Sequence, residues 1–167
     1  ILDLLFVNPS TGQPRTMLQE TYLTSYVSEV TDETLTFLPK SKQFVWQSER
    51  DGYNHLYLYD INGKLLQQIT KGPWEVTSFY GVDEANGLAY YSSTEGSHLE
   101  RQIFAIRLDG GGKTALTSTP GWHTAEFSSG YSYFIETFSA WNTPPVVTLR
   151  DKKGQSVRVL RDNAVTR

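Results

Sequence analysis

Asp60-Ile61-Asn62-Gly63-Lys64 decides the fold, because its pattern of residues occurs four times in this 167-residue chain. The other three copies begin at Asn8, Asp109 and Asp151. In each copy Asx begins a turn, glycine supplies a positive φ, and apolar runs on both sides can pair, which is typical of a β-hairpin. A hairpin that recurs at a period of roughly 40 to 50 residues indicates the blades of a β-propeller.

Another pair of short strands precedes each of the last three hairpins. These pairs are residues 35–38 and 44–46, residues 76–80 and 88–92, and residues 124–127 and 131–138. Aromatic residues make up 13% of the chain, which favours strands over helices. We therefore predict an all-β fold, a partial β-propeller with about three four-stranded antiparallel blades and half a blade at the N-terminus.

The repeats also predict how the chain divides. We expect all of it to belong to one propeller domain, with the end of a blade at 1–23, blades at 24–73, 74–121 and 122–163, and the start of a linker at 164–167. A closed ring normally has at least four blades. The chain also starts without methionine, inside an apparent strand, so we expect it to be a piece of a longer protein.

Two tryptophans mark the passages between repeats. Trp74 ends the stretch Ile69-Thr70-Lys71-Gly72-Pro73-Trp74, and Trp122 ends the similar stretch 116–122 in the next repeat. A wide ring at this point can cover the boundary between neighbouring sheets. Both tryptophans are predicted to be packing residues.

Composition excludes several functions. The net charge of −3, with both signs interspersed, gives no basic stripe, so neither nucleic acid nor a lipid surface is predicted as a partner. No apolar run approaches the roughly 20 residues that cross a bilayer. Zero cysteine excludes disulfides, thiolate metal sites and a cysteine nucleophile. We predict no cofactor and no metal.

Histidine chemistry is the first candidate for a site. His55, His98 and His123 can in principle act as bases or metal ligands, but none has a partner at ligand spacing within an organised motif. A structural or solvated role is the interpretation that we favour for all three.

Charged loops are the second candidate. Glu49, Arg50 and Asp51 can form an ion-pair network or contact a substrate, or they can form a solvated turn whose Asp caps the backbone; we favour the solvated turn. An acidic cluster of the same kind, which can bind cations or amines but which we interpret as a solvated loop, consists of Glu29, Asp32 and Glu33. The stretch 110–113 has glycines before a lysine but lacks the spacing of a phosphate loop, so it is predicted to be a hairpin turn.

A resemblance to a known family rests on four stretches. Residues 44–60 and 69–76 closely resemble a blade and the following turn of bacterial dipeptidyl peptidase IV-like enzymes of the prolyl oligopeptidase family. The resemblance continues through residues 142–147 and ends at residues 159–163, which resemble the stretch just before the hydrolase domain of that family. The resemblance implies an eight-bladed N-terminal propeller, of which this chain is similar to the last blades.

The same resemblance implies where the chemistry lies. In that family the catalytic Ser, Asp and His follow the propeller, and paired glutamates that hold the substrate amine precede the part resembled here. This chain has no G-x-S-x-G elbow, so we expect no catalytic, cofactor-binding or metal-binding residue in it. The stretch 26–31 corresponds to one that approaches the extended substrate pocket, but its residues match poorly and none is assigned to that pocket.

The expected function follows from the resemblance. The chain is expected to be a non-catalytic part of the propeller that gates the substrate chamber of a serine exopeptidase releasing N-terminal Xaa-Pro or Xaa-Ala dipeptides. The resemblance implies a bacterial, periplasmic or secreted parent, with a peptide substrate, the hydrolase domain and the remaining blades as partners. Uncovered sheets are expected to make the isolated piece self-associate. The alternative is a stand-alone propeller scaffold that binds a protein or glycan.

Overall fold

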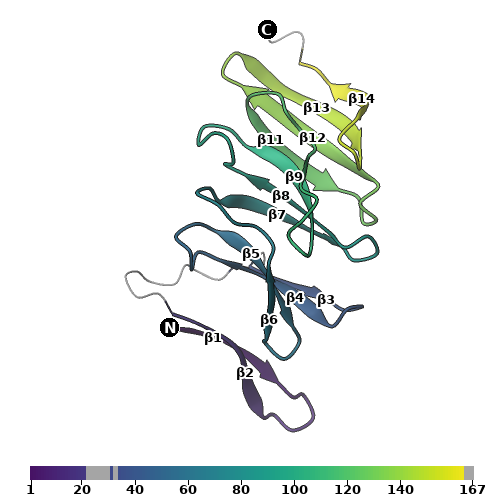
Figure 1. The fold of residues 1–167 in the computed structure, drawn as a ribbon. Helices are drawn as coiled ribbons and strands as arrows, with labels where there is room; N and C mark the ends of the chain where they lie inside the picture. Colours follow the sequence, from purple (N-terminus) through teal and green to yellow (C-terminus); the bar gives the residue numbers. More distant parts are fainter. Residues whose placement is uncertain (22–30, 32–33, 164–167) are drawn as a thin grey trace.

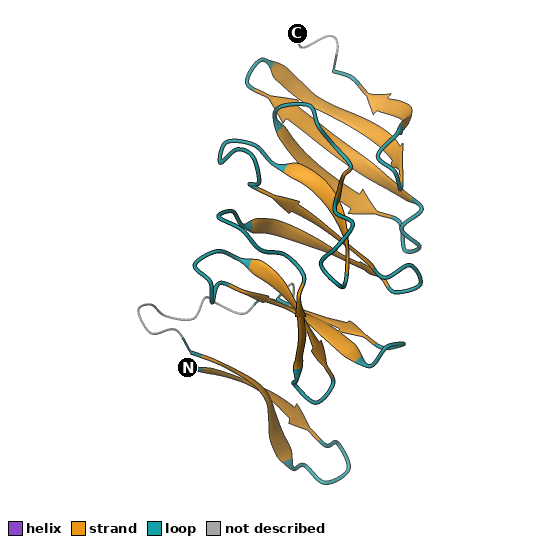
Figure 2. Cartoon of the chain, in the orientation of Figure 1, coloured by secondary structure: helices purple, strands orange, loops and turns teal. Residues whose placement is uncertain are grey.

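Strands form all the regular structure in the described part of the chain. The computed structural model describes residues 1–21, 31 and 34–163. Four antiparallel sheets follow one another from the N-terminus to the C-terminus, as Figure 1 shows, and we label them A to D. Figure 2 shows the same arrangement, with loops joining strands throughout. The prediction of an all-β chain is confirmed.

Sheets A and B occupy the N-terminal part of the chain. Sheet A consists of β1 (Leu2–Val7) and β2 (Pro14–Glu20). Sheet B consists of β3 (Leu35–Leu38), β4 (Gln43–Ser48), β5 (His55–Asp60) and β6 (Leu65–Gln68), which pair in chain order. Sheet B is therefore a four-stranded meander of the kind that forms a propeller blade.

Sheets C and D repeat this topology. Sheet C consists of β7 (Val76–Asp83), β8 (Leu88–Ser93), β9 (Gln102–Arg107) and β10 (Thr114–Ala115). Sheet D consists of β11 (Trp122–Phe127), β12 (Tyr133–Ala140), β13 (Thr143–Asp151) and β14 (Ser156–Arg161). Three four-stranded sheets and one two-stranded sheet confirm the predicted partial β-propeller.

One predicted strand begins too early. The apolar stretch 131–138 suggests a strand from Tyr131, whereas β12 begins at Tyr133. Tyr131 has a φ of 51° and donates its backbone N–H to the carbonyl of Ser128, so it belongs to the turn after β11. Its ring instead stacks on Tyr90 of β8, with centroids 5.0 Å apart. The aromatic character of Tyr131 serves packing between sheets, not strand pairing.

The repeated hairpin turns use their Asx residues as predicted. Asp60 accepts hydrogen bonds from the backbone N–H groups of Asn62 and Lys64, at 2.8 and 2.9 Å. Gly63 has a φ of 87°, and a Cβ added there would lie 1.6 Å from the carbonyl oxygen of Met17 in sheet A. Glycine is therefore required at this turn both for its backbone conformation and for close contact with the preceding sheet.

The hydrophobic cores lie between successive sheets. Because side chains alternate along a strand, Tyr91 of β8 faces sheet B while its neighbour Tyr90 faces sheet D. We call the boundary between sheets B and C the first seam, and the boundary between sheets C and D the second seam. The largest core cluster fills the first seam, with Leu38, Val45, Leu56 and Leu58 of sheet B against Ala89, Tyr91, Phe104 and Ile106 of sheet C. Sheets B and C thus bury both faces against their neighbours, as propeller blades do, whereas sheets A and D have a neighbour on one side only.

Candidate functional site

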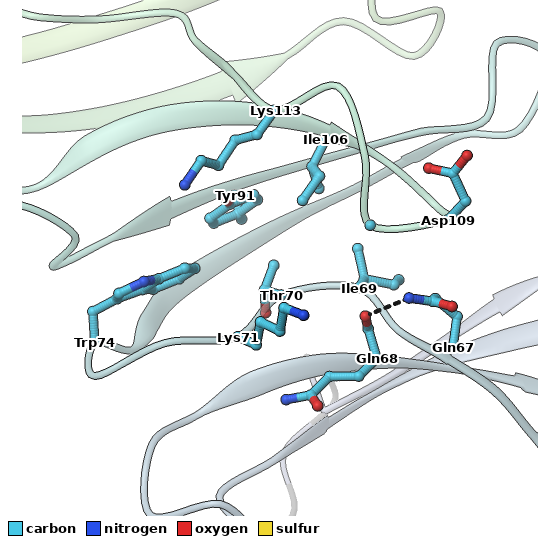
Figure 3. A pocket seen from close by; sticks show the side chains of 11 residues that line it. Gln67, Gln68, Ile69, Thr70, Lys71, Trp74, Tyr91, Ile106, Asp109 and Lys113 are labelled. Carbon is cyan, nitrogen blue, oxygen red and sulfur yellow. Dashed lines mark hydrogen bonds between the residues drawn. The ribbon is translucent and has the colours of Figure 1, made fainter.

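A pocket of about 280 Å³ opens at the first seam (Figure 3). Sheet B and the connection that follows it form its lower wall in this view, and sheet C with the turn between β9 and β10 forms its upper wall. The lining residues are Gln67, Gln68, Ile69, Thr70, Lys71 and Trp74 below, and Tyr91, Ile106, Asp109, Gly110 and Lys113 above or behind. We call this the seam pocket.

Backbone and side-chain hydrogen bonds fix the lower wall. The Thr70 hydroxyl accepts the backbone N–H of Leu56 at 2.9 Å and lies 3.1 Å from Nδ1 of His55. The other ring nitrogen of His55, Nε2, lies 3.1 Å from the carbonyl oxygen of Gly72, to which it can donate. His55 thereby ties β5 to the passage into sheet C, and the structural role predicted for it is confirmed.

Trp74 closes one end of the seam pocket. Its indole meets the ring of His55 edge-on at 4.9 Å and stacks on Tyr91 at 6.1 Å. Only 8% of Trp74 is exposed. The packing role predicted for Trp74 is therefore confirmed.

Two ion pairs on the upper wall neutralise most of its charge. Lys113 Nζ lies 2.5 and 2.7 Å from the two carboxylate oxygens of Glu95, and 5.6 Å from the ring centroid of Trp74. Asp109 pairs with Arg107, and hydrogen bonds from Arg107 and from the backbone of Gly111 lower the pKa of the Asp109 carboxyl. Each of the two acidic side chains is therefore matched by a cation.

Tyr91 contributes a buried hydroxyl at the seam pocket. The residue is fully buried, and its hydroxyl has no hydrogen-bond partner among the described residues. Burial, followed by the negative charge of Glu95, raises the pKa of Tyr91. The hydroxyl thus keeps its proton at neutral pH and remains a donor without an acceptor.

The second seam contains a buried charged cluster. His123 Nδ1 lies 2.7 Å from Oε1 of Glu136, and Nε2 lies 2.8 Å from the carbonyl oxygen of Thr119. Arg150 donates from Nε to the other Glu136 oxygen at 2.6 Å. Both ring nitrogens of His123 face acceptors, so both are satisfied only as donors. The structural role predicted for His123 is confirmed, whereas His98 is exposed.

Trp122 occupies the second seam without being buried. Its backbone bridges to Arg101 of sheet C, and the Arg101 guanidinium lies 4.6 Å from the Trp122 ring centroid. The position at a boundary between sheets is as predicted. With 48% of Trp122 exposed, however, the prediction that it is a packing residue is wrong in the described part of the chain, because one ring face meets a cation instead of a core.

The charged tip between β4 and β5 is more ordered than predicted. Arg50 pairs with the buried Glu20 of sheet A, and its guanidinium lies 4.3 Å from the ring centroid of Tyr57. Asp51 accepts hydrogen bonds from the Tyr57 hydroxyl and the Gln68 amide, both at 2.7 Å. Glu49, Arg50 and Asp51 are exposed in a turn, as predicted for a solvated turn. The ion-pair alternative also holds in part, because Arg50 pairs with Glu20 and so bridges sheets A and B.

The remaining candidates differ in whether the structure describes them. Residues 26–30, 32 and 33, which include the predicted acidic cluster, lie outside the described residues. The glycines at 110 and 112 have φ values of 81° and 61° in the turn between β9 and β10, which confirms a hairpin turn at that stretch. Within residues 1–21, 31 and 34–163, no three His, Asp or Glu side chains gather as metal ligands. The same part of the chain contains no helix with the length and apolar character that crossing a bilayer requires.

Sequence reasoning missed the seam pocket. Lys71 and Trp74 belong to the stretch recognised as a passage between repeats, but Lys113 and Tyr91 are contributed by the next repeat. Nothing in the local sequence indicates that a hairpin turn of that next repeat covers this passage. The one available signal was that Thr70 and Lys71 place polar side chains where two sheets meet.

The stacked four-stranded sheets define the class of protein as a part of a β-propeller. The sequence pattern described as the dipeptidyl peptidase IV (DPP IV) N-terminal region matches residues 1–145. The chain therefore belongs to the family of the dipeptidyl peptidase IV N-terminal region. The resemblance noted from the sequence is thus confirmed.

Individual relatives agree with this assignment. A probable dipeptidyl peptidase 4 of Aspergillus flavus is 29% identical over 127 residues, which cover 75% of this chain and 16% of the relative. The crystal structure of Porphyromonas gingivalis dipeptidyl peptidase 4 matches 97% of this chain with a TM-score of 0.89 and 37% identity, and 23% of its own chain is covered. A putative dipeptidyl aminopeptidase IV from Bacteroides ovatus shares the fold, with a TM-score of 0.74 and 24% identity. The chain thus spans less than a quarter of each of the first two relatives.

Proposed function

We propose that this chain is a non-catalytic part of the propeller of a dipeptidyl peptidase IV-like serine exopeptidase, which releases N-terminal Xaa-Pro or Xaa-Ala dipeptides. The observation that carries the proposal is the match of the family pattern to residues 1–145 together with the structural match over 97% of the chain. Both relatives are named as dipeptidyl peptidases, and both extend far beyond the matched part.

The proposed contribution of the chain is to gate and shape a substrate chamber. Stacked sheets with buried faces make a stiff wall, and a wall of this kind admits peptides of limited size while it excludes folded proteins. Hydrolysis by a serine nucleophile, with a histidine base and an oxyanion hole, belongs to another part of the intact enzyme in this proposal.

The proposal also includes the organisation of the intact protein. Residues 1–23 end one blade, residues 24–73, 74–121 and 122–163 form three more, and residues 164–167 begin the linker to a hydrolase domain. The proposed location is the bacterial periplasm or the exterior of the cell. On its own the piece is expected to self-associate, because Val157, Val159 and Leu160 on the edge strand β14 are each about half exposed.

The test uses the longer protein that contains this chain. It is expected to release 4-nitroaniline from Gly-Pro-4-nitroanilide but not from the N-acetylated substrate, because a dipeptidyl peptidase requires a free amine. A folded protein that begins with Gly-Pro at a structured N-terminus should resist cleavage, whereas the excised N-terminal peptide should be cut. No release from the free substrate contradicts the peptidase proposal, and equal cleavage of folded and excised forms contradicts the gating role.

A further inference from the structure

The seam pocket has no part in the proposed gating, and the hydrogen bonds of its wall restrict what it can bind. Three acceptors of the wall are already in use. Asp109 is occupied by Arg107 and the backbone of Gly111, and the Thr70 hydroxyl accepts the backbone N–H of Leu56. The Gln68 carbonyl accepts the side-chain amide of Gln67.

Two hydrogen-bond donors of the pocket, in contrast, have no acceptor among the described residues. Lys71 has no hydrogen bond or ion pair with any of the residues that the structure describes, and Figure 3 shows its ammonium group on the lower wall. The Tyr91 hydroxyl, buried just behind the surface of the pocket, has no acceptor there either. A buried donor without a partner costs about 1–3 kcal/mol, so an occupant that brings an acceptor is favoured.

The net charge of the pocket wall also favours an occupant that carries a negative charge. Lys113 is balanced by Glu95, and Asp109 is balanced by Arg107, at distances of 2.5 and 2.7 Å. The Lys71 ammonium is left as one uncompensated positive charge. A single negative charge on the occupant would neutralise it.

The apolar side chains of the pocket indicate that the remainder of the ligand is apolar. Ile69, which follows β6, and Ile106 of β9 belong to the buried core and line the floor of the pocket, and the indole of Trp74 closes one end. A volume of about 280 Å³ lies at the small end of ligand pockets in proteins. The space suits a compact apolar body that carries one acidic group.

We propose that the seam pocket binds a small organic carboxylate, with the carboxylate on Lys71 and the apolar body over Ile69 and Ile106, beside the indole of Trp74. The Tyr91 hydroxyl is closed to water in the free chain, so the occupant reaches it by displacing side chains at the wall, and Tyr91 then donates to the carboxylate. Because the walls come from sheets B and C, the occupant contacts both sheets and stabilises the first seam by mass action.

The test is a solution NMR titration of the chain with benzoate and, as a neutral probe of the same shape, benzamide. Benzoate should shift the indole N–H of Trp74 and the side-chain amide of Gln67, and should raise the melting temperature of the chain. Benzamide should bind at least about tenfold more weakly, since hydrogen bonds to charged groups exceed neutral ones by about that factor.

Two substitutions and a control locate the binding. Lys71→Gln should lower benzoate affinity about tenfold and leave benzamide binding unchanged. Lys64→Gln removes an exposed lysine from the turn after β5, outside the pocket, and should change neither. Tyr91→Phe, which keeps the ring, should weaken benzoate binding by a smaller factor. Equal affinity for the two probes, or unchanged benzoate affinity in Lys71→Gln, overturns the proposal.

Discussion

The first and second seams share the connection that leads into them but differ in the side chains packed next to it. In the first seam, Thr70 accepts the backbone N–H of Leu56, and in the second, Thr117 accepts that of Ile103, both at 2.9 Å. Both seams have an apolar core. Next to the shared connection, however, the first seam has the rings of His55, Trp74 and Tyr91, whereas the second has the buried charged groups of His123, Glu136 and Arg150.

This difference shows that the repeated sequence specifies the path of the backbone, and that the side chains of each seam then stabilise it in their own way. An apolar seam depends on area removed from water, and so on the size of its rings. A buried charged seam depends on complete pairing, because desolvated charges are costly when one partner is missing. The two seams should therefore respond differently to the same kind of change.

Truncating the two seam tryptophans should give the largest contrast. Trp74→Ala removes a buried ring from between sheets B and C and should lower the free energy of unfolding by roughly 3–5 kcal/mol. Trp122→Ala removes a half-exposed ring and should cost less than about 1 kcal/mol. Urea unfolding followed by circular dichroism measures both. Equal losses would show that the seams do not differ in the burial of their tryptophans.

Neutralising the buried carboxylate should affect only the second seam. Glu136→Gln leaves His123 and Arg150 without their shared counter-ion and should cost about 3 kcal/mol of unfolding free energy. Glu126→Gln, on the exposed side of the neighbouring strand β11, is the matched control and should leave stability unchanged. A stable Glu136→Gln variant would mean that the charged cluster is dispensable.

The stability contributed by Glu136 should depend on pH. Burial alone would raise the pKa of Glu136, but hydrogen bonds from His123 and Arg150 lower it below the ordinary value of 4.5. A carboxyl with a lowered pKa stabilises the fold above its unfolded pKa, and that contribution is lost as the pH falls through the folded value. The stability difference between wild type and Glu136→Gln should thus be full near about pH 7 and shrink below about pH 4. A difference that stays constant down to about pH 2 would contradict this.

The shared connection should respond equally in both seams. Thr70→Val and Thr117→Val each remove the acceptor of a buried backbone N–H and should each cost about 1–2 kcal/mol. Urea unfolding of the two variants tests whether the two equivalent hydrogen bonds contribute the same free energy of unfolding as well as having the same geometry. If only one variant loses stability, the two seams share the path of the backbone but not the energetic contribution of this threonine.

The two buried histidines should differ in the number of N–H protons on their rings. This difference is measured in the unmodified chain, so it requires no change in stability. His55 lies between a hydroxyl and a carbonyl, so one donated proton satisfies it. His123 lies between a carboxylate and a carbonyl, which requires two. Solution NMR should therefore detect two ring N–H protons on His123 and one on His55. A single ring proton on His123 would contradict its assignment as a double donor.

Much of the fold could be predicted from the sequence, because the repeat rests on local chemistry. Asp60 and Gly63 determine their own turn, and alternation along β8 determines which face of a sheet each tyrosine covers. The pairing of Arg50 with Glu20 could not be predicted, since it joins residues far apart in the chain that belong to different sheets. The seam pocket escaped prediction for the same reason: its walls meet only after the sheets have stacked.

The intact mass of the protein, as its native host produces it, tests the proposed function most directly. The chain of 18.9 kDa covers 23% of the Porphyromonas gingivalis enzyme, so a peptidase of that organisation should have a mass of about 80 kDa. That mass, with a hydrolase sequence after residue 167, is the result we predict. A native mass no larger than the 18.9 kDa of this chain would contradict the proposal and favour a stand-alone scaffold.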